Sequence, residues 1–259
     1  MRNRMTEELA VCGFNAVAAA AEFHPENINR LFLREDRLKS FTGICKKLAE
    51  RKRPYKLCEN EELERICKTS HHQGVVAMIF APEPKPLERE DLDEWAENGK
   101  TGLVLHSLGN DHNLGAIVRS AAFFDAPFIV ISENDPGAQL TTSAYRVAEG
   151  GMEHVRIFTV QNTEALIKDA SRVLVTLGAE SRARLRIRDL PGMVNEHKAR
   201  LRRDSRPGVA LVLGNEETGL PREVKDSCSA LVRIPGTGLM DSLNVAQAAT
   251  LFLHELFEF

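Results

Sequence analysis

Short apolar segments alternate with helical stretches after about residue 100, and this alternation constrains the fold more than any other feature of the sequence. Six segments of strand length are almost entirely apolar: residues 103–105, 128–132, 155–158, 173–176, 209–213 and 231–234. A strand that is apolar on both faces must be covered on both faces, which is typical of a mostly parallel sheet between layers of helices. We therefore predict an α/β fold for residues 102–259, ending in a helix over residues 243–258.

A smaller α/β pattern precedes this region. Helical periodicity over residues 15–22, 36–52 and 60–69 alternates with strand patterns over residues 30–33, 56–58 and 75–80. Three prolines between residues 82 and 86 then favour extended backbone, and an acidic stretch follows at residues 88–97. We predict a small α/β domain over residues 1–81, a linker with an acidic helix over residues 82–101, and the larger domain over residues 102–259.

The charge balance excludes a protein that attracts nucleic acid through its net charge. Lys and Arg number 34 against 37 Asp and Glu, so any surface for nucleic acid must be a local patch. The best candidate is the stretch of residues 182–206, which holds nine basic residues against three acids and otherwise suggests a solvated loop. No apolar run is long enough for a membrane span, and the N-terminus lacks a signal core, so we expect a soluble protein that is not exported.

The cysteines and histidines give no metal or disulfide pattern. The five cysteines are dispersed and form no CxxC pair, which favours buried reduced thiols: Cys12, Cys45, Cys58, Cys67 and Cys228. The histidines, His71 and His72 included, lack the spacing of metal ligands. We expect no metal site.

Two glycine-rich segments can be tested against familiar nucleotide-binding motifs. The loop that begins at Gly214 has the glycine spacing of a phosphate-binding loop, but Leu220 and Pro221 stand where Lys and Ser or Thr would have to reach the phosphates. The segment of residues 236–241 lacks the third glycine of a dinucleotide fingerprint and follows a late strand. Neither a kinase-type loop nor a Rossmann cofactor site is predicted.

Three strand-to-helix junctions with polar, glycine-containing loops remain. Their sequences are LGNDHNLGAIVRS at residues 108–120, LVLGNEETGLP at residues 211–221 and IPGTGLMDSLNVAQA at residues 234–248. Ligands of open α/β sheets gather at such strand ends, so we expect the three loops to form one site. In the first, Asn113 is expected to cap a helix that begins near Leu114, and Arg119 projects from that helix almost two turns later.

These three blocks, in this order, resemble the three motifs of the SpoU family of RNA ribose methyltransferases, part of the SPOUT superfamily. The segments VCGFNAV at residues 11–17 and HQGVV at residues 72–76 are similar to the start and end of the small RNA-binding domain in members that modify 23S ribosomal RNA. The resemblance implies transfer of a methyl group from S-adenosylmethionine to a ribose 2′-hydroxyl of rRNA or tRNA. It also implies a trefoil-knotted C-terminal domain, a homodimer whose active sites draw on both subunits, and a cytoplasmic location.

The family's functional residues can be carried over onto matching positions. The catalytic set falls on Asn113, Arg119, Glu216, Ser242 and Asn244, and the cofactor-binding set falls on Gly178, Leu213, Gly214, Ile234 and Leu243. Two positions depart from the family pattern, because most members carry Met at the place of Gly236 and Ser at the place of Ala246. The loop of residues 236–241 is therefore expected to differ from that of other members.

The roles implied for these residues compete with simpler ones. Arg119 could be a solvated or ion-paired arginine, Asn113 an N-cap, and Ser242 the cap of the last helix. If Arg119 is functional, we prefer a clamp on the substrate phosphate to a base, because a guanidinium stays protonated near neutral pH. Glu216 could then hold Arg119 in place.

Two other functions stay open. A non-catalytic RNA-binding protein could keep this fold, although the intact Asn113, Arg119, Glu216 and Asn244 argue against it. Base methylation by a related SPOUT branch is disfavoured, because those branches do not use this arginine motif.

Overall fold

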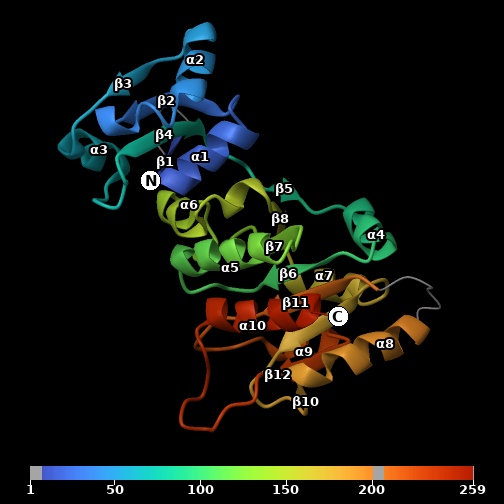
Figure 1. Ribbon diagram of the computed structural model, residues 1–259. Helices are drawn as coiled ribbons and strands as arrows, with labels where there is room; N and C mark the ends of the chain where they lie inside the picture. Colours follow the sequence, from blue (N-terminus) through green and yellow to red (C-terminus); the bar gives the residue numbers. More distant parts are fainter. Residues whose placement is uncertain (1–7, 201–206, 259) are drawn as a thin grey trace. The chain divides into compact units, whose positions relative to one another are not determined.

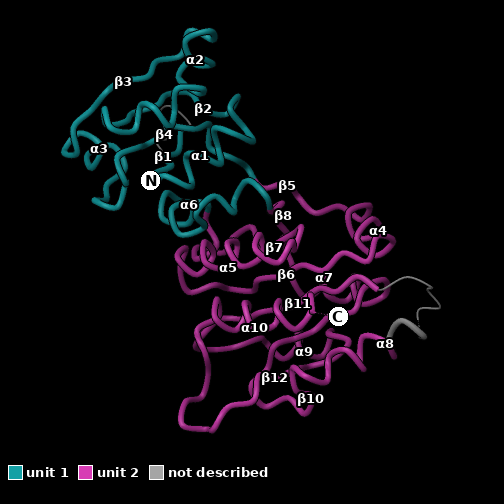
Figure 2. Tube along the Cα trace, viewed as in Figure 1, with its two compact units in different colours: residues 1–83, 140–154 teal, residues 84–139, 155–259 magenta. Residues whose placement is uncertain are grey.

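The computed structural model describes residues 8–200 and 207–258 of the chain. The chain forms two compact units (Figure 2). Unit 1 comprises Met1–Glu83 and Leu140–His154, and unit 2 comprises Pro84–Gln139 and Val155–Phe259. The short segment Leu140–His154, which lies within the predicted larger domain, thus belongs to the first unit.

Unit 1 is a four-stranded sheet with the strand order β1-β4-β2-β3, in which β2 and β3 are parallel and the other pairs antiparallel. Its strands are β1 (Glu8–Cys12), β2 (Ile28–Leu33), β3 (Tyr55–Leu57) and β4 (Val75–Phe80). Its helices are α1 (Phe14–Phe23), α2 (Thr42–Glu50), α3 (Asn60–Cys67) and α6 (Thr142–Ala148), with a 3₁₀ turn at Gly151–Glu153. Tyr145 on α6 is buried in the same core as Val11 and Leu31, so the segment from the second half of the chain completes the core of this unit.

Two predictions for this unit were wrong. The first strand was missed, although Glu8–Cys12 is buried throughout; Gly13, with a φ of 100°, then separates the strand from α1. The single helix predicted over residues 36–52 is a 3₁₀ turn at Glu35–Arg37 followed by α2. Phe41 lies between them with its side chain in the core, and a continuous helix does not form there.

Unit 2 is an eight-stranded sheet in which every pairing is parallel, with the order β10-β12-β9-β11-β6-β7-β8-β5 (Figure 1). Its strands are β5 (Lys85–Pro86), β6 (Thr101–Leu105), β7 (Phe128–Ser132), β8 (Arg156–Val160), β9 (Val175–Ala179), β10 (Leu185–Arg186), β11 (Val209–Leu213) and β12 (Ala230–Arg233). Its helices are α4 (Arg89–Glu97), α5 (Asp111–Phe123), α7 (Thr163–Ala170), α8 (Leu190–Arg200), α9 (Arg222–Ser227) and α10 (Val245–Phe257). The predicted α/β fold with a mostly parallel sheet is confirmed.

Of the segment predicted as a linker, residues 84–101 are part of unit 2. Its last proline, Pro86, lies in β5, which pairs with β8 at the edge of the sheet. In α4, Leu92 and Trp95 are buried, and the Trp95 ring stacks on that of Phe128 with centroids 3.6 Å apart. The acidic face of α4 is therefore balanced by an apolar face that anchors this helix in the core.

The basic stretch is more ordered than the predicted loop. It contains β10, a 3₁₀ turn at Ile187–Asp189 and the helix α8, whereas residues 201–206 lie outside the described residues. Leu190 and Val194, one helical turn apart, are both buried, and Pro191 is suited to a first helical turn.

All five cysteines are free; Cys228 is partly exposed and the other four are buried. In the described part of the chain, no helix is long and apolar enough to cross a membrane.

Candidate active site

The three polar loops of the sequence follow β6, β11 and β12 in unit 2. The strands β6 and β11 are parallel neighbours whose last residues, Leu105 and Leu213, lie side by side. Parallel neighbours in register end at the same edge of a sheet, so the loops after them start next to each other. The His106 backbone N–H donates to the Leu213 carbonyl at 2.8 Å and extends this alignment by one residue.

One chain of hydrogen bonds joins all three loops. The Glu216 carboxylate, from the second loop, accepts hydrogen bonds from the Asn113 side-chain amide and from the Gly109 backbone N–H, the latter at 3.0 Å. The Asn113 side-chain carbonyl accepts in turn from the amide of Asn244, in the third loop, at 3.0 Å. Three residues of the predicted catalytic set, far apart in sequence, are thereby held together.

The two helix caps differ from the predictions. Asn110, not Asn113, caps α5, and its side-chain oxygen accepts from the Asn113 backbone N–H at 3.0 Å. Asn244, not Ser242, caps α10, and its side-chain oxygen accepts from the Ala246 backbone N–H at 2.9 Å. Because Asn113 lies inside the first turn of α5, its side chain is free to bridge Glu216 and Asn244.

A tight turn after β11 sets the position of Glu216. The Asn215 side-chain oxygen accepts from the backbone N–H groups of Glu217 and Thr218 at 2.9 and 3.1 Å, and its amide donates to the Ser107 carbonyl at 2.9 Å. A side chain at Gly214 would put its Cβ 2.5 Å from the Gly219 carbonyl carbon, so only glycine allows this turn to close. Asn215 was not singled out from the sequence, although Asn before such a turn is a common signal.

Arg119 and Ser242 lie outside this network. Both side chains are exposed, and no ion pair joins Arg119 to any residue in the described ranges. In α5, Arg119 follows Asn113 by six residues, which places it about 240° around the helix and about 9 Å along it. The suggested ion pair between Glu216 and Arg119 is not seen; the Glu216 oxygens bond instead to Gly109 and Asn113.

The predicted cofactor residues lie on or next to three neighbouring strands and at the two ends of the third loop. Leu213 ends β11 and Gly214 follows it, and Gly178 in β9 pairs with Leu231 of β12. A Cβ at Gly178 would lie 2.6 Å from the Leu231 Cδ2 atom, so a side chain here would require the Leu231 side chain to move. Ile234 is partly exposed, and Leu243 is 46% exposed.

The loop of residues 235–243 offers backbone groups beside apolar side chains, and among these groups only the Leu239 N–H has a partner in the described chain, the Thr237 hydroxyl oxygen at 3.5 Å. As far as the structure describes the chain, none of its backbone groups pairs with another backbone group. Leu239 and Met240 are 88% and 82% exposed. Such a loop is suited to a ligand that has both an apolar ring and polar edges. At Gly236, a family departure, a Cβ would meet no atom within 4 Å.

His106 and Asp135 lie beneath the first loop. Burial lowers the pKa of His106, although the nearby Asp135 carboxylate opposes this shift. The Nδ1 atom of His106 is buried and has no hydrogen-bond partner within the described ranges. A neutral imidazole is therefore favoured here. The sequence offered no signal for either residue.

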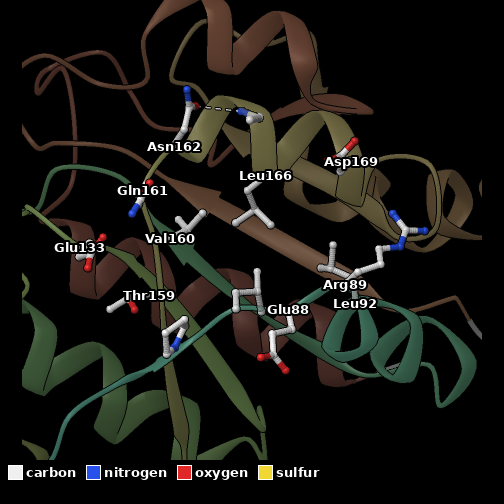
Figure 3. A pocket seen from close by; sticks show the side chains of 13 residues that line it. Glu88, Arg89, Leu92, Glu133, Thr159, Val160, Gln161, Asn162, Leu166 and Asp169 are labelled. Atoms are coloured by element: carbon white, nitrogen blue, oxygen red, sulfur yellow. Dashed lines mark hydrogen bonds between the residues drawn. The ribbon is translucent and has the colours of Figure 1, made fainter.

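A pocket of about 480 Å³ lies elsewhere in unit 2, between β5, α4, β8 and α7 (Figure 3). Apolar side chains such as Leu92, Val160 and Leu166 line it together with Glu133 and Asp169. It contains none of the residues predicted from the motifs, so it does not add to the site at the loops.

The chain matches two family sequence models. The model of the SpoU rRNA methylase family matches residues 100–254, and a model described as RNA 2′-O ribose methyltransferase substrate binding matches residues 10–85. Among relatives, the 23S rRNA (guanosine-2′-O-)-methyltransferase RlmB of Acinetobacter baylyi is 31% identical over 250 residues, which cover 94% of each chain. The RlmB protein of Nitrosomonas europaea is 29% identical, with 98% of this chain and 92% of the relative covered.

Solved structures share the fold. The SpoU methyltransferase AviRb from Streptomyces viridochromogenes, in complex with AdoMet, gives a TM-score of 0.72 at 20% identity, covering 100% of this chain and 93% of that chain. The AdoMet-bound rRNA methyltransferase from Sinorhizobium meliloti gives a TM-score of 0.70 at 23% identity, covering 97% and 87%. At these sequence identities the similarity shows a shared fold and nothing more.

Proposed function

Because this chain belongs to the SpoU rRNA methylase family, we propose that it transfers the methyl group of S-adenosylmethionine to a ribose 2′-hydroxyl of RNA. The observation that carries the proposal is the hydrogen-bonded chain of Glu216, Asn113 and Asn244. It joins the three motif loops at the carboxyl edge of a parallel sheet, where such folds bind their ligands. If these polar side chains only contacted solvent, they would have no reason to form hydrogen bonds with one another.

The loop of residues 235–243 fits the proposed cofactor. Its unpaired backbone groups suit the edges of an adenine, and the exposed Leu239, Met240 and Leu243 suit its faces. We propose that Leu243 and Ile234, with Leu213, Gly214 and Gly178 at the neighbouring strand ends, hold the cofactor. When bound, S-adenosylmethionine supplies a methyl group already activated by a positively charged sulfur.

The protein must then align the ribose oxygen and favour the loss of its proton. We assign the alignment to Arg119, because its exposed guanidinium has no ion pair in the part of the chain that the structure describes and is free to bind a phosphate. The same cation stabilises negative charge that develops on the oxygen. Asn113, Glu216 and Asn244 hold the loops and the start of α5. Ser242, exposed beside them, completes the proposed set.

Ribosomal RNA is the proposed substrate. The similarity to RlmB proteins over nearly the whole chain supports this choice over tRNA, and so does the substrate-binding model matched in unit 1. The free cysteines agree with a cytoplasmic location, where thiols stay reduced.

A homodimer is proposed to form through α5 and α10. These helices pack against each other, and the Ser120 and Thr250 hydroxyls lie 2.7 Å apart where they meet. Phe123 on α5 is 81% exposed and Leu251 on α10 is 45% exposed. Large apolar side chains left exposed on paired helices favour a self-complementary interface. The trefoil knot that the resemblance implies stays a prediction.

Two measurements test the function. Titration calorimetry should detect binding of S-adenosylmethionine, and ribose methylation mapped in ribosomal RNA from a deletion strain should lack one site present in the parent. The site should return when the wild-type gene is restored, but not with an Arg119→Ala gene. A protein that binds RNA while every methylation persists in the deletion strain would favour the non-catalytic alternative.

A further inference from the structure

A buried carboxylate supports the first motif loop from behind. Asp135 follows β7 and is only 5% exposed. One carboxylate oxygen accepts the Leu108 backbone N–H at 2.7 Å, and the other accepts the Gly137 N–H at 2.9 Å. No Lys or Arg within residues 8–196 and 207–258 forms an ion pair with it. Burial of a carboxylate is costly unless charge-assisted hydrogen bonds offset it, so these two bonds fix its place.

Gly137 brings the backbone of this same loop against the motif loop. A Cβ at Gly137 would lie 1.9 Å from the Leu108 carbonyl oxygen and 3.0 Å from the Asn110 nitrogen. No side chain can be accommodated at that distance. The loop after β7 therefore rests directly on the backbone of residues 108–110.

Three consecutive residues of the motif loop are thus held from two sides. The Ser107 carbonyl accepts from Asn215, the Leu108 N–H donates to Asp135, and the Gly109 N–H donates to Glu216. Ser107 has a φ of 56°, a left-handed conformation that costs a non-glycine residue free energy and persists only when its surroundings impose it.

We propose that Asp135 is a positioning residue for methyl transfer. It sets the Leu108–Gly109 peptide, and through it the start of α5, the helix that carries Asn113 and Arg119. The inference rests on the proposed function. Asp135 acts through the motif loop, without contact to the reacting groups, so its replacement should change the rate of the chemical step and leave binding intact.

The test replaces Asp135 in the full chain. Asp135→Asn keeps the size of the side chain, but its amide NH₂ must face one of two backbone N–H donors. We expect the single-turnover methylation rate, at saturating RNA and S-adenosylmethionine, to fall by about 10- to 100-fold. Cofactor affinity by calorimetry and RNA affinity by filter binding should stay at wild-type values.

A second variant disturbs the same pair of loops by another route. Gly137→Ala leaves Asp135 intact but forces the two loops apart, so it should give the same decrease in rate with unchanged affinities. The matched control is Asn162→Ala, which removes the N-cap of α7 at the end of β8. It should lower the melting temperature without a change in rate.

The outcomes separate the two proposals. If wild-type protein methylates RNA and both Asp135→Asn and Gly137→Ala do so at the wild-type rate, the positioning role is overturned. A fall of cofactor affinity in parallel with rate would also overturn it, because Asp135 would then only maintain the fold of the pocket. If neither Asp135→Asn nor Gly137→Ala folds, Asp135→Ser decides by the same criteria, because its smaller side chain fits without a clash and its one hydroxyl oxygen cannot hold both N–H groups in the way that the carboxylate does. Wild-type protein without methyl transfer would instead overturn the proposed function.

Discussion

At the scale of single residues, the exposed Arg119 separates an enzyme from a binding protein. If its guanidinium aligns the ribose and stabilises developing charge, Arg119→Ala should lower single-turnover methylation by about 10²–10³-fold, the usual effect of removing one such donor. The variant should stay folded and bind S-adenosylmethionine, because no described interaction ties Arg119 to the cofactor loop. Rapid-quench assays and calorimetry check the two halves of this prediction.

Arg119→Lys is the matched variant. An ammonium cannot reproduce the planar two-point hold on a phosphate, so the lysine should restore little of the rate. Near wild-type methylation by Arg119→Ala at saturating RNA would remove Arg119 from the mechanism. Ser242 or Glu216 would then be the candidates for aligning the ribose oxygen and favouring the loss of its proton.

Glu216 provides a second residue-scale prediction. Both of its oxygens accept hydrogen bonds, so the NH₂ of a glutamine must face a donor, either Gly109 or Asn113. Glu216→Gln should therefore lower the free energy of unfolding by about 1–3 kcal/mol, measured by denaturant titration. The neighbouring Glu217 is exposed, and Glu217→Gln should change it by less than about 0.5 kcal/mol. Equal stability of the two variants would mean that the hydrogen-bonded chain contributes nothing.

Three residues that match the family's motifs, Asn113, Glu216 and Asn244, prove to be hydrogen-bonded to one another, but the contacts could not be predicted from the sequence. Arg119 and Ser242, selected in the same way, lie outside this chain of hydrogen bonds, and the catalytic roles of all five stay predictions.

That Asn113, Glu216 and Asn244 bond to one another depends on the alignment of β6 with β11 and on which neighbouring residue caps each helix. Asn110 and Asn113 are both suitable caps, and they lie three residues apart. Because α5 begins after Asn110, the Asn113 side chain is not used as the cap and bonds to Glu216 instead.

At the scale of elements, buried parallel strands were the most predictable part of the fold. The strand β11 is apolar throughout and buried on both faces, so composition alone indicated it. The strand β1 begins with Glu8, whose buried carboxylate accepts hydrogen bonds from Asn29 and Arg30 of β2. A partner 22 residues away cannot be inferred from local pattern, and for this reason the strand was missed.

The segment around β10, which follows β9, is predicted to bind RNA through its arginines. Arg184 and Arg188 are exposed and Arg186 is partly so, in the segment around β10. Replacing all three by Ala should weaken RNA binding and reduce the slope of log affinity against log salt by about 0.7–0.9 for each phosphate that the variant no longer binds. Filter binding at several salt concentrations measures the slope.

The matched control removes three positive charges elsewhere on unit 2. Arg89, Arg172 and Arg222 are exposed and paired with nearby acids. Their replacement by Ala should leave the salt slope unchanged. Equal slopes for wild type and both triple variants would identify the segment around β10 as a solvated surface.

At the scale of the whole molecule, the proposed dimer places Arg119 at the boundary between subunits. Phe123 follows Arg119 by one helical turn, so the two side chains lie on one face of α5. Phe123→Arg should put like charges opposite each other and yield monomers in sedimentation experiments. Methylation should fall as well, because each proposed site would then lack its partner subunit.

Tyr55→Arg serves as the control for Phe123→Arg. Tyr55 is 45% exposed on β3 of unit 1, and its replacement should preserve the dimer. A Phe123→Arg protein that stays dimeric would exclude the face of α5 and α10 as the interface. A monomeric wild-type protein would exclude the dimer itself.

The segment Leu140–His154 has a consequence for synthesis on the ribosome. The core of unit 1 stays open until Tyr145 arrives, although the rest of that unit is complete at Glu83. Translation of the roughly 60 residues between Glu83 and Tyr145 takes about 3–12 s at about 5–20 residues per second. During that interval β6, α5 and β7 leave the exit tunnel ahead of the piece that the first unit lacks. Unit 1 can therefore complete its core only after a substantial part of unit 2 has been synthesised.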